Sequence, residues 1–210
     1  MWSSPLFWIA LAVALFWTLG AYNRLMRLRS AVVQAFGSFD AHMVRGVALL
    51  GEFTVAADSA SRVDLRGSES QDIAALHGAT TQLSASLAVA RARPLDADAI
   101  AALVAARNVL VVCWQAAVVR AQAETLDTAL EATDAPEARL MSGAKAPVAA
   151  MGMAPLWQTR WGELAAQAEQ AAHVYDDAVA QYNAAISQFP ASVLAWVFGF
   201  KDALGLRAAT

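Results

Sequence analysis

Residues 156–189 read LWQTRWGELAAQAEQAAHVYDDAVAQYNAAISQF and carry the strongest periodic signal in the chain. Apolar side chains recur there at spacings that alternate between four and three residues, which keeps them on one face of a helix. The pattern predicts a helix from about Leu156 to Gln188 whose seam faces other helices. The seam comprises Trp157, Trp161, Leu164, Ala168, Ala171, Tyr175, Ala178, Tyr182, Ala185 and Phe189.

Three earlier segments show the same helical period. The first ends near Asp58–Ser61 and carries a seam of Val32, Phe36, Phe39, Met43, Gly46, Leu50, Phe53 and Ala57. The second runs from Glu69 to about Arg93, where Pro94 stops it, and Asp96 caps a third from about Ala97 to Ala132. The prolines and glycines of 133–155 predict a loop.

No segment alternates with the period of a strand, so the sequence predicts an all-α fold. Short connections make sequential helices antiparallel neighbours. We therefore expect an elongated antiparallel four-helix bundle with coiled-coil packing over 22–190, preceded by a membrane segment over 1–21 and followed by an apolar C-terminal segment over 191–210.

Composition excludes several classes of protein. The chain of 210 residues is 58% apolar and 16% charged, which is apolar enough to exclude disorder over most of its length. A net charge of −3, with Lys145 and Lys201 as the two lysines, argues against a nucleic-acid partner. The single cysteine, Cys113, excludes an internal disulfide and a cysteine-based zinc site.

The N-terminal stretch from Pro5 to Ala21 reads PLFWIALAVALFWTLGA, with Leu11 and Leu15 in its interior. No charged side chain precedes Arg24, so the uncharged stretch approaches the roughly 20 residues that span a bilayer. A cleaved signal peptide would carry a basic start and a small-residue cleavage site, and this stretch has neither. A buried core helix is the other alternative. We predict an uncleaved single-pass transmembrane helix.

Side chains that favour membrane interfaces flank this helix. Trp17 and Tyr22 are aromatic, and Arg24, Arg27 and Arg29 follow directly. The positive-inside rule then places the N-terminus outside and the bundle in the cytoplasm. In the C-terminal segment Trp196 is a further candidate anchor, and we expect this segment either to lie in the interface or to cap the bundle.

The third predicted helix contains an apolar run from Val109 to Val119. Only 12 residues separate Arg107 from Arg120, about 18 Å of helix, whereas the hydrocarbon core of a bilayer is about 30 Å thick. We therefore expect this run to be buried on several sides in the bundle.

Two blocks of the chain resemble the LemA family of bacterial membrane proteins. The first reads YNRLMRLR over 22–29 and is followed by Ala35-Phe36 and Asp40. The second comprises Tyr175, Asp176, Val179, Tyr182-Asn183, Ile186, Phe189-Pro190 and Gly199-Phe200, with Asp176 where the family usually has Asn. The resemblance implies a short extracytoplasmic N-terminus, one span in the bacterial inner membrane and a helical bundle, and it implies no enzymatic activity.

Helical bundles can also hold metal ions between their helices. Carboxylate-bridged metals need Glu-x-x-His on two helices, and the chain has no such motif. His173, Asp176 and Asp177 share a helical face, so a metal- or redox-active bundle is the alternative function. We predict a non-catalytic membrane-anchored scaffold or adaptor without a cofactor, whose partners are the lipid bilayer, an unidentified protein and possible further copies of itself.

Overall fold

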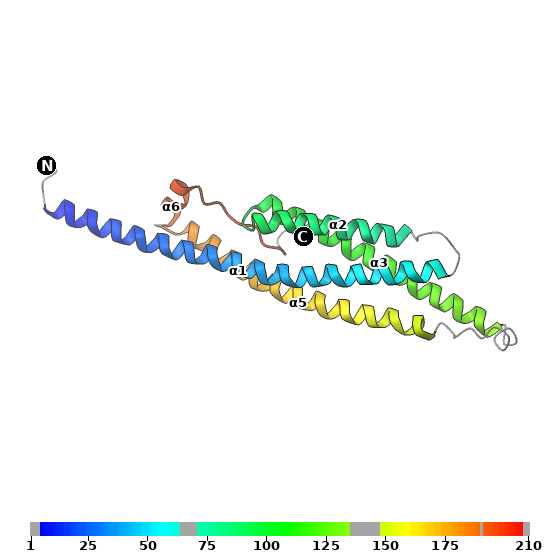
Figure 1. The fold of residues 1–210 in the computed structure, drawn as a ribbon. Coiled ribbons are helices and arrows are strands. Elements are labelled where there is room, and N and C mark those ends of the chain that lie inside the picture. The colour runs from blue at the N-terminus through cyan, green and yellow to red at the C-terminus, as the bar shows by residue number, and fades with distance from the viewer. Residues whose placement is uncertain (1–4, 64–70, 135–147, 190, 208–210) are drawn as a thin grey trace. The chain divides into compact units, whose positions relative to one another are not determined.

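The computed structural model describes residues 5–63, 71–134, 148–189 and 191–207 (Figure 1). Over these residues the protein is all-α, with no strand. The helices are α1 (Pro5–Val63), α2 (Gln71–Ala92), α3 (Ala97–Asp134), α5 (Val148–Ser187) and α6 (Ala191–Phe198).

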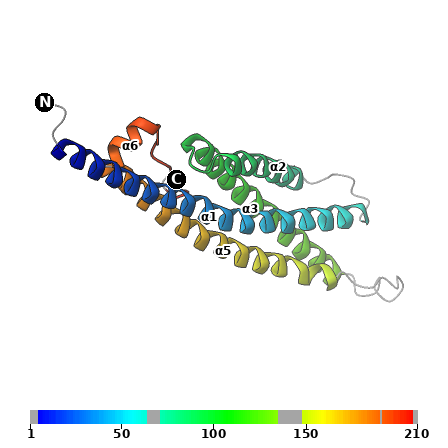
Figure 2. The same cartoon turned by 60° about the vertical axis from the view of Figure 1, so that its left-hand side comes forward.

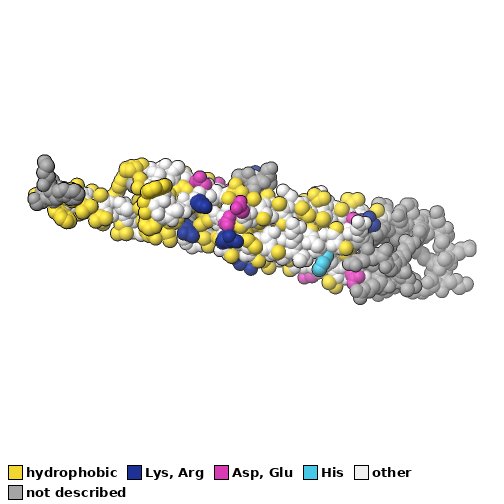
Figure 3. All heavy atoms as spheres, turned by 90° about the horizontal axis from the view of Figure 1, so that it is seen from above, with side chains coloured by type: hydrophobic (Ala, Val, Ile, Leu, Met, Phe, Trp, Pro, Cys, Tyr) yellow, Lys and Arg dark blue, Asp and Glu magenta, His cyan; other side chains and the backbone are white. Residues whose placement is uncertain are grey.

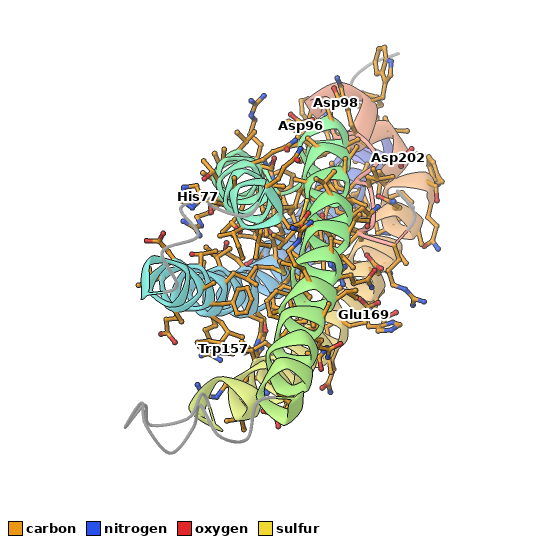
Figure 4. The ribbon with its side chains drawn as sticks, turned by 90° about the vertical axis from the view of Figure 1, so that its right-hand side faces the viewer. His77, Asp96, Asp98, Trp157, Glu169 and Asp202 are labelled. Carbon is orange, nitrogen blue, oxygen red and sulfur yellow. The ribbon has the colours of Figure 1, made fainter. Side chains whose placement is uncertain are left out.

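The helix ends follow local sequence signals. Pro5 opens α1, at the one position where a missing N–H costs nothing. Asp96 caps α3 because its Oδ1 accepts a hydrogen bond from the N–H of Asp98 at 3.1 Å. Figure 4 shows both aspartates at this end of α3. The N-cap predicted at Asp96 is confirmed.

Helices occupy both ends of the segment 133–155, which the sequence predicts to be a loop. Helix α3 continues to Asp134, and α5 begins at Val148, so that Pro155 lies inside a helix. The residues before Pro155 are mostly alanine and methionine, which favour helix despite the lost hydrogen bond and the ring clash that an internal proline introduces.

The chain forms two compact units, and residues of α1, α2, α3 and α5 contribute to both. Unit 1 comprises 1–41, 87–104 and 169–210. Its core is built on Phe36, whose ring meets the ring of Tyr175 edge-on at 5.8 Å between centroids. The other buried side chains include Leu25, Val32, Phe39, Leu87, Ile100, Leu103, Val179 and Tyr182.

Unit 2 comprises 42–86 and 105–168 and has an aromatic core. The Phe53 ring lies 5.0 Å from that of Trp114 and 5.9 Å from that of Trp157, centroid to centroid, both in edge-on contacts. Figure 4 shows Trp157 between α5 and the end of α1. Trp161 also contacts Trp114, and a Cβ on Gly46 would lie 3.4 Å from the Trp161 ring. Gly46, a member of the predicted α1 seam, is buried against the Trp161 side chain.

Two predictions about burial are wrong. Phe189 does not extend the α5 seam, because α5 ends at Ser187 and the Phe189 side chain is 74% exposed. The apolar run of α3 is buried on one side only: Trp114 is buried, whereas Val112 and Val119 are 66% and 65% exposed. Apolar residues surround the helix in this run, while its neighbours cover only part of its circumference.

Candidate membrane interface

The first part of α1 exposes a continuous apolar surface. Among the described residues, two helices are long and apolar enough to cross a membrane by length and composition: one within α1 and one spanning Ala97–Ala123 of α3. Of the most apolar 18 residues, 6% are buried in α1 and 39% in α3. The α1 stretch therefore has the stronger need for an apolar environment that the chain itself does not supply.

The residues predicted to span a membrane lie in this exposed stretch. Pro5, Leu11 and Leu15 are exposed, and Ala21 is half-buried. Of the predicted interface anchors that follow, Trp17 is exposed and Tyr22 is half-buried. Arg24, Arg27 and Arg29 are exposed on the next turns of α1.

The C-terminal segment of the chain runs along this part of α1. Three contacts follow one another in order: the Phe189 ring lies 5.4 Å from Trp17 and the Phe198 ring 5.5 Å from Tyr22, between centroids, and the Arg29 guanidinium lies 5.9 Å from the centre of the Phe200 ring. Figures 1 and 2 show α6 beside α1. The segment therefore follows α1 from the apolar stretch to the arginines.

Gly199 ends α6 and turns the chain. Its φ of 69° lies in the left-handed region that glycine adopts without steric cost. The N–H of Phe200 donates to the carbonyl oxygen of Ala195 at 2.9 Å, which is the bond that closes a helix C-terminus of the Schellman type. The Gly-Phe pair at 199–200 therefore sets the direction in which the rest of the chain leaves α6.

Residues Lys201–Arg207, which we call the C-terminal tail, run antiparallel to α5 and are held by its polar side chains. Asn183 Nδ2 donates to the carbonyl oxygen of Ala203 at 2.8 Å, and the N–H of Ala203 donates to Asn183 Oδ1 at 2.9 Å. Further along, the N–H of Leu206 donates to Asp176 Oδ1 at 2.7 Å. Ala203 and Leu206 are buried, so the tail belongs to the core of unit 1.

The two seam tyrosines of α5 also bind main-chain carbonyls. The Tyr182 hydroxyl donates to the carbonyl oxygen of Lys201 at 3.3 Å. The Tyr175 hydroxyl lies 2.8 Å from the carbonyl oxygen of Pro94, between α2 and α3, and 3.3 Å from that of Leu204. Buried tyrosine hydroxyls need an acceptor, and the tail provides two.

The surroundings of these tyrosines keep their hydroxyls protonated. Burial raises the pKa of Tyr175 above its ordinary value of 10.0, and the negative charge of Asp176 raises it further. Burial also raises the pKa of Tyr182, an effect that Arg29 opposes and Asp202 supports. Both side chains therefore act as neutral hydrogen-bond donors to the carbonyls that they contact.

An ion pair joins α1 to α2 in unit 1. Arg91 Nε and Nη2 donate to the two carboxylate oxygens of Asp40 at 3.0 and 2.8 Å. This is the planar two-bond geometry in which arginine and carboxylate pair best. Asp40 thus has a structural partner 51 residues away along the chain.

The side chains of the alternative metal site contact protein groups instead. Arg207 Nη1 lies 2.9 Å from His173 Nδ1, and Arg207 Nε lies 3.6 Å from Glu169 Oε1. Asp176 accepts the backbone N–H of Leu206, while Asp177 is exposed. Over the part of the chain that the structure describes, no group of three histidine, cysteine or acidic side chains is arranged to hold a metal ion.

Sequence reasoning missed the role of the polar residues that hold the tail. In the sequence, Asn183 stands out only as part of the second block, Asp176 only through that block and the alternative metal site, and the tail itself carries no pattern. The available signal was their spacing: seven residues on a helix place both side chains on one face, beside Tyr175 and Tyr182. Comparison with models of known families, with curated proteins and with solved structures finds no significant match to this chain.

Proposed function

We propose that this protein is a single-pass membrane scaffold of the LemA type, without catalytic activity. The observation that carries the proposal is the continuity of α1. Its exposed apolar stretch leads without a break into residues such as Phe36 and Phe39, which are buried in the core of unit 1. Such a helix anchors the chain and supports its folded part at the same time.

In this proposal α1, α2, α3 and α5 form an antiparallel four-helix bundle in the cytoplasm of a bacterial cell, and the N-terminus lies outside. Two observations support it. The bundle seams predicted on α1 and α5 are largely buried, and the arginines that follow the apolar stretch are exposed, as cytoplasmic flanking residues are. The LemA resemblance of the blocks at 22–40 and 175–200 supports the same arrangement.

The scaffold needs a surface for a protein partner, and we assign it to an uncharged stripe on α3 in unit 2. Exposed side chains recur there at alternating spacings of four and three: Ala105, Val109, Val112, Ala116, Val119 and Ala123. This is the spacing of a helix-packing seam, and no described residue of unit 2 covers it. A partner helix, from another protein or a second copy, would bury it.

Site-specific photocrosslinking in native membranes tests this function. A photoreactive amino acid at Val112, on the stripe, should capture a defined protein, which mass spectrometry then identifies. The matched control is Gln158, an exposed position on α5 in the same unit. Capture of the same proteins from both positions, or of none from Val112, would contradict the assignment of the stripe as a binding surface.

Anchoring and orientation need a second measurement. In a Cys113→Ser background, Val174→Cys places a thiol at an exposed site of α5. An impermeant thiol reagent should label it only after the cells are permeabilised, and alkaline carbonate should leave the protein in the membrane. Labelling in intact cells would reverse the topology, and release by carbonate would rule out the anchor.

A further inference from the structure

The C-terminal segment 189–200 contains no charged side chain, and Ser192 is the one residue in it with a polar side chain. A helix that is apolar on all sides needs an apolar environment on all sides. For α6 the protein provides this environment on one side. Leu194 and Ala195 are buried, and Phe198 packs against Tyr22 of α1.

The other side of the segment is exposed. Its exposed apolar side chains within α6 lie at the i, i+3 and i+4 spacing of a single helical face: Val193, Trp196 and Val197. Phe189, which precedes the helix, is exposed as well, and we call these four residues the outer face. Trp196 is 85% exposed. Figure 3 shows hydrophobic side chains together over α6 and the adjoining part of α1, with Lys and Arg as well as Asp and Glu side chains next to them.

The contacts with α1 fix the level of α6 along that helix. Phe189 meets Trp17, inside the apolar stretch, and Phe200 meets Arg29, past its end. These two α1 residues are 12 positions apart, which is about 18 Å along a helix. Helix α6 lies between the two contacts, at Tyr22, where the apolar stretch gives way to arginines. This is the level at which a bilayer changes from acyl chains to headgroups.

The charges around α6 favour anionic headgroups. Arg24, Arg27 and Arg29 are exposed, and no acidic residue occurs in the chain before Asp40, which is paired with Arg91. Lys201 follows the segment directly and is exposed as well. Arg29 and Lys201 therefore lie next to an uncharged surface, and Arg24 and Arg27 lie on neighbouring turns of α1. Asp202 is the one acidic residue of 189–207.

We propose that the outer face of the C-terminal segment binds the lipid bilayer, lying in the boundary between acyl chains and anionic headgroups of the leaflet in which the α1 span ends. Phe189 inserts deepest, Trp196 lies at the boundary, and the arginines and Lys201 contact lipid phosphates. The chain then contacts the membrane at two points, α1 and α6, and the tail that follows Gly199 ties α6 to α5. This inference rests on the proposed anchoring by α1.

Spin-label accessibility in the full-length protein, reconstituted in vesicles of phosphatidylcholine and phosphatidylglycerol, tests the inference. In a Cys113→Ser background, a nitroxide is attached after Val193→Cys or Trp196→Cys. Oxygen, which dissolves in the bilayer, and a water-soluble nickel complex compete to relax the label. Labels at 193 and 196 should show an oxygen-to-nickel ratio several-fold above that of a control label placed by Val174→Cys, an exposed position on α5.

A label placed by Leu15→Cys separates this inference from the proposed function. If the label at 15 reports acyl chains while the labels at 193 and 196 match the control at 174, the α6 inference fails and the anchor stands. If the label at 15 also matches the control, both fail. Dipolar broadening between labels at 196 that disappears on dilution with unlabelled protein would mean that a second copy covers the outer face, which also overturns the inference.

The role of the cations is tested with the same labels. The ratio at 196 should be higher in vesicles that contain phosphatidylglycerol than in phosphatidylcholine alone, because each cation near an anionic surface favours binding. Replacing Lys201 and Arg27 with glutamine should reduce this difference, because Arg24 and Arg29 remain. Equal ratios in the two kinds of vesicle would overturn the assignment of these side chains to lipid phosphates.

Discussion

Asn183→Ala should detach the C-terminal tail from α5. The substitution removes two hydrogen bonds, of 2.8 and 2.9 Å, that pair the side-chain amide with both backbone groups of Ala203. A hydrogen bond contributes about 0.5–1.5 kcal/mol net, so the pair contributes about 1–3 kcal/mol. Because Ala203 is buried, its N–H and C=O lose their partners without gaining water, which favours the upper part of that range.

A second substitution at the same position sharpens the test. Asn183→Asp keeps an acceptor for the N–H of Ala203 but sets a carboxylate oxygen against the carbonyl oxygen of Ala203. It should destabilise more than Asn183→Ala at neutral pH. Because the repulsion favours the protonated carboxyl, the folded-state pKa of that group is raised, and stability should recover as the pH falls and the carboxyl can donate.

Urea unfolding of the full chain in detergent micelles, followed by circular dichroism, measures these losses. Hydrogen exchange at the amides of Ala203 and Leu206 reports separately on release of the tail. Gln181→Ala is the matched control, since Gln181 is exposed on the same helix. Equal unfolding free energies for the Asn183 and Gln181 variants, with unchanged exchange at Ala203, would refute the assignment of Asn183 to the tail.

Three further predictions concern Tyr175, two glycines of α1, and Tyr182. Because the pKa of Tyr175 is raised in the folded protein, the stability that its hydroxyl contributes is fully present below the ordinary tyrosine pKa of 10.0 and is lost as the pH rises above that value. Thermal melts at alkaline pH should therefore show a decline in stability that Tyr175→Phe reduces. Identical pH profiles for the two proteins would contradict this. Gly37→Ala should stabilise the fold by up to about 1 kcal/mol, because a Cβ at that position meets open space. Gly46→Leu should cost about 1–3 kcal/mol, because a Cβ at position 46 would already meet the indole ring of Trp161. Unfolding curves that rank the two variants the other way would count against the packing described. Thermal melts should show a cost of about 3–5 kcal/mol for Tyr182→Ala, which removes a buried ring, and little change for Gln181→Ala.

The sequence by itself determined the helices and most of what they bury. A helical period is a local property, written in residues three and four apart, so the seam of α1 from Val32 to Phe53 and most of the α5 seam could be predicted before any packing was known. The N-terminal apolar stretch and the cap at Asp96 were predictable for the same reason. Each depends on neighbours within a few turns.

Only the tertiary structure decided which residues meet at long separation. Asp40 pairs with Arg91, Tyr175 reaches Pro94, and Asn183 holds the tail, and none of these pairs shares a local pattern. The sequence wrongly predicts burial of Phe189 and of the exposed valines of α3. Apolar character indicates that a side chain avoids water, but it does not indicate which part of the protein covers that side chain. The tail has no periodicity because its hydrogen bonds go to another segment rather than to itself, and such partners exist only once α5 has folded beside it.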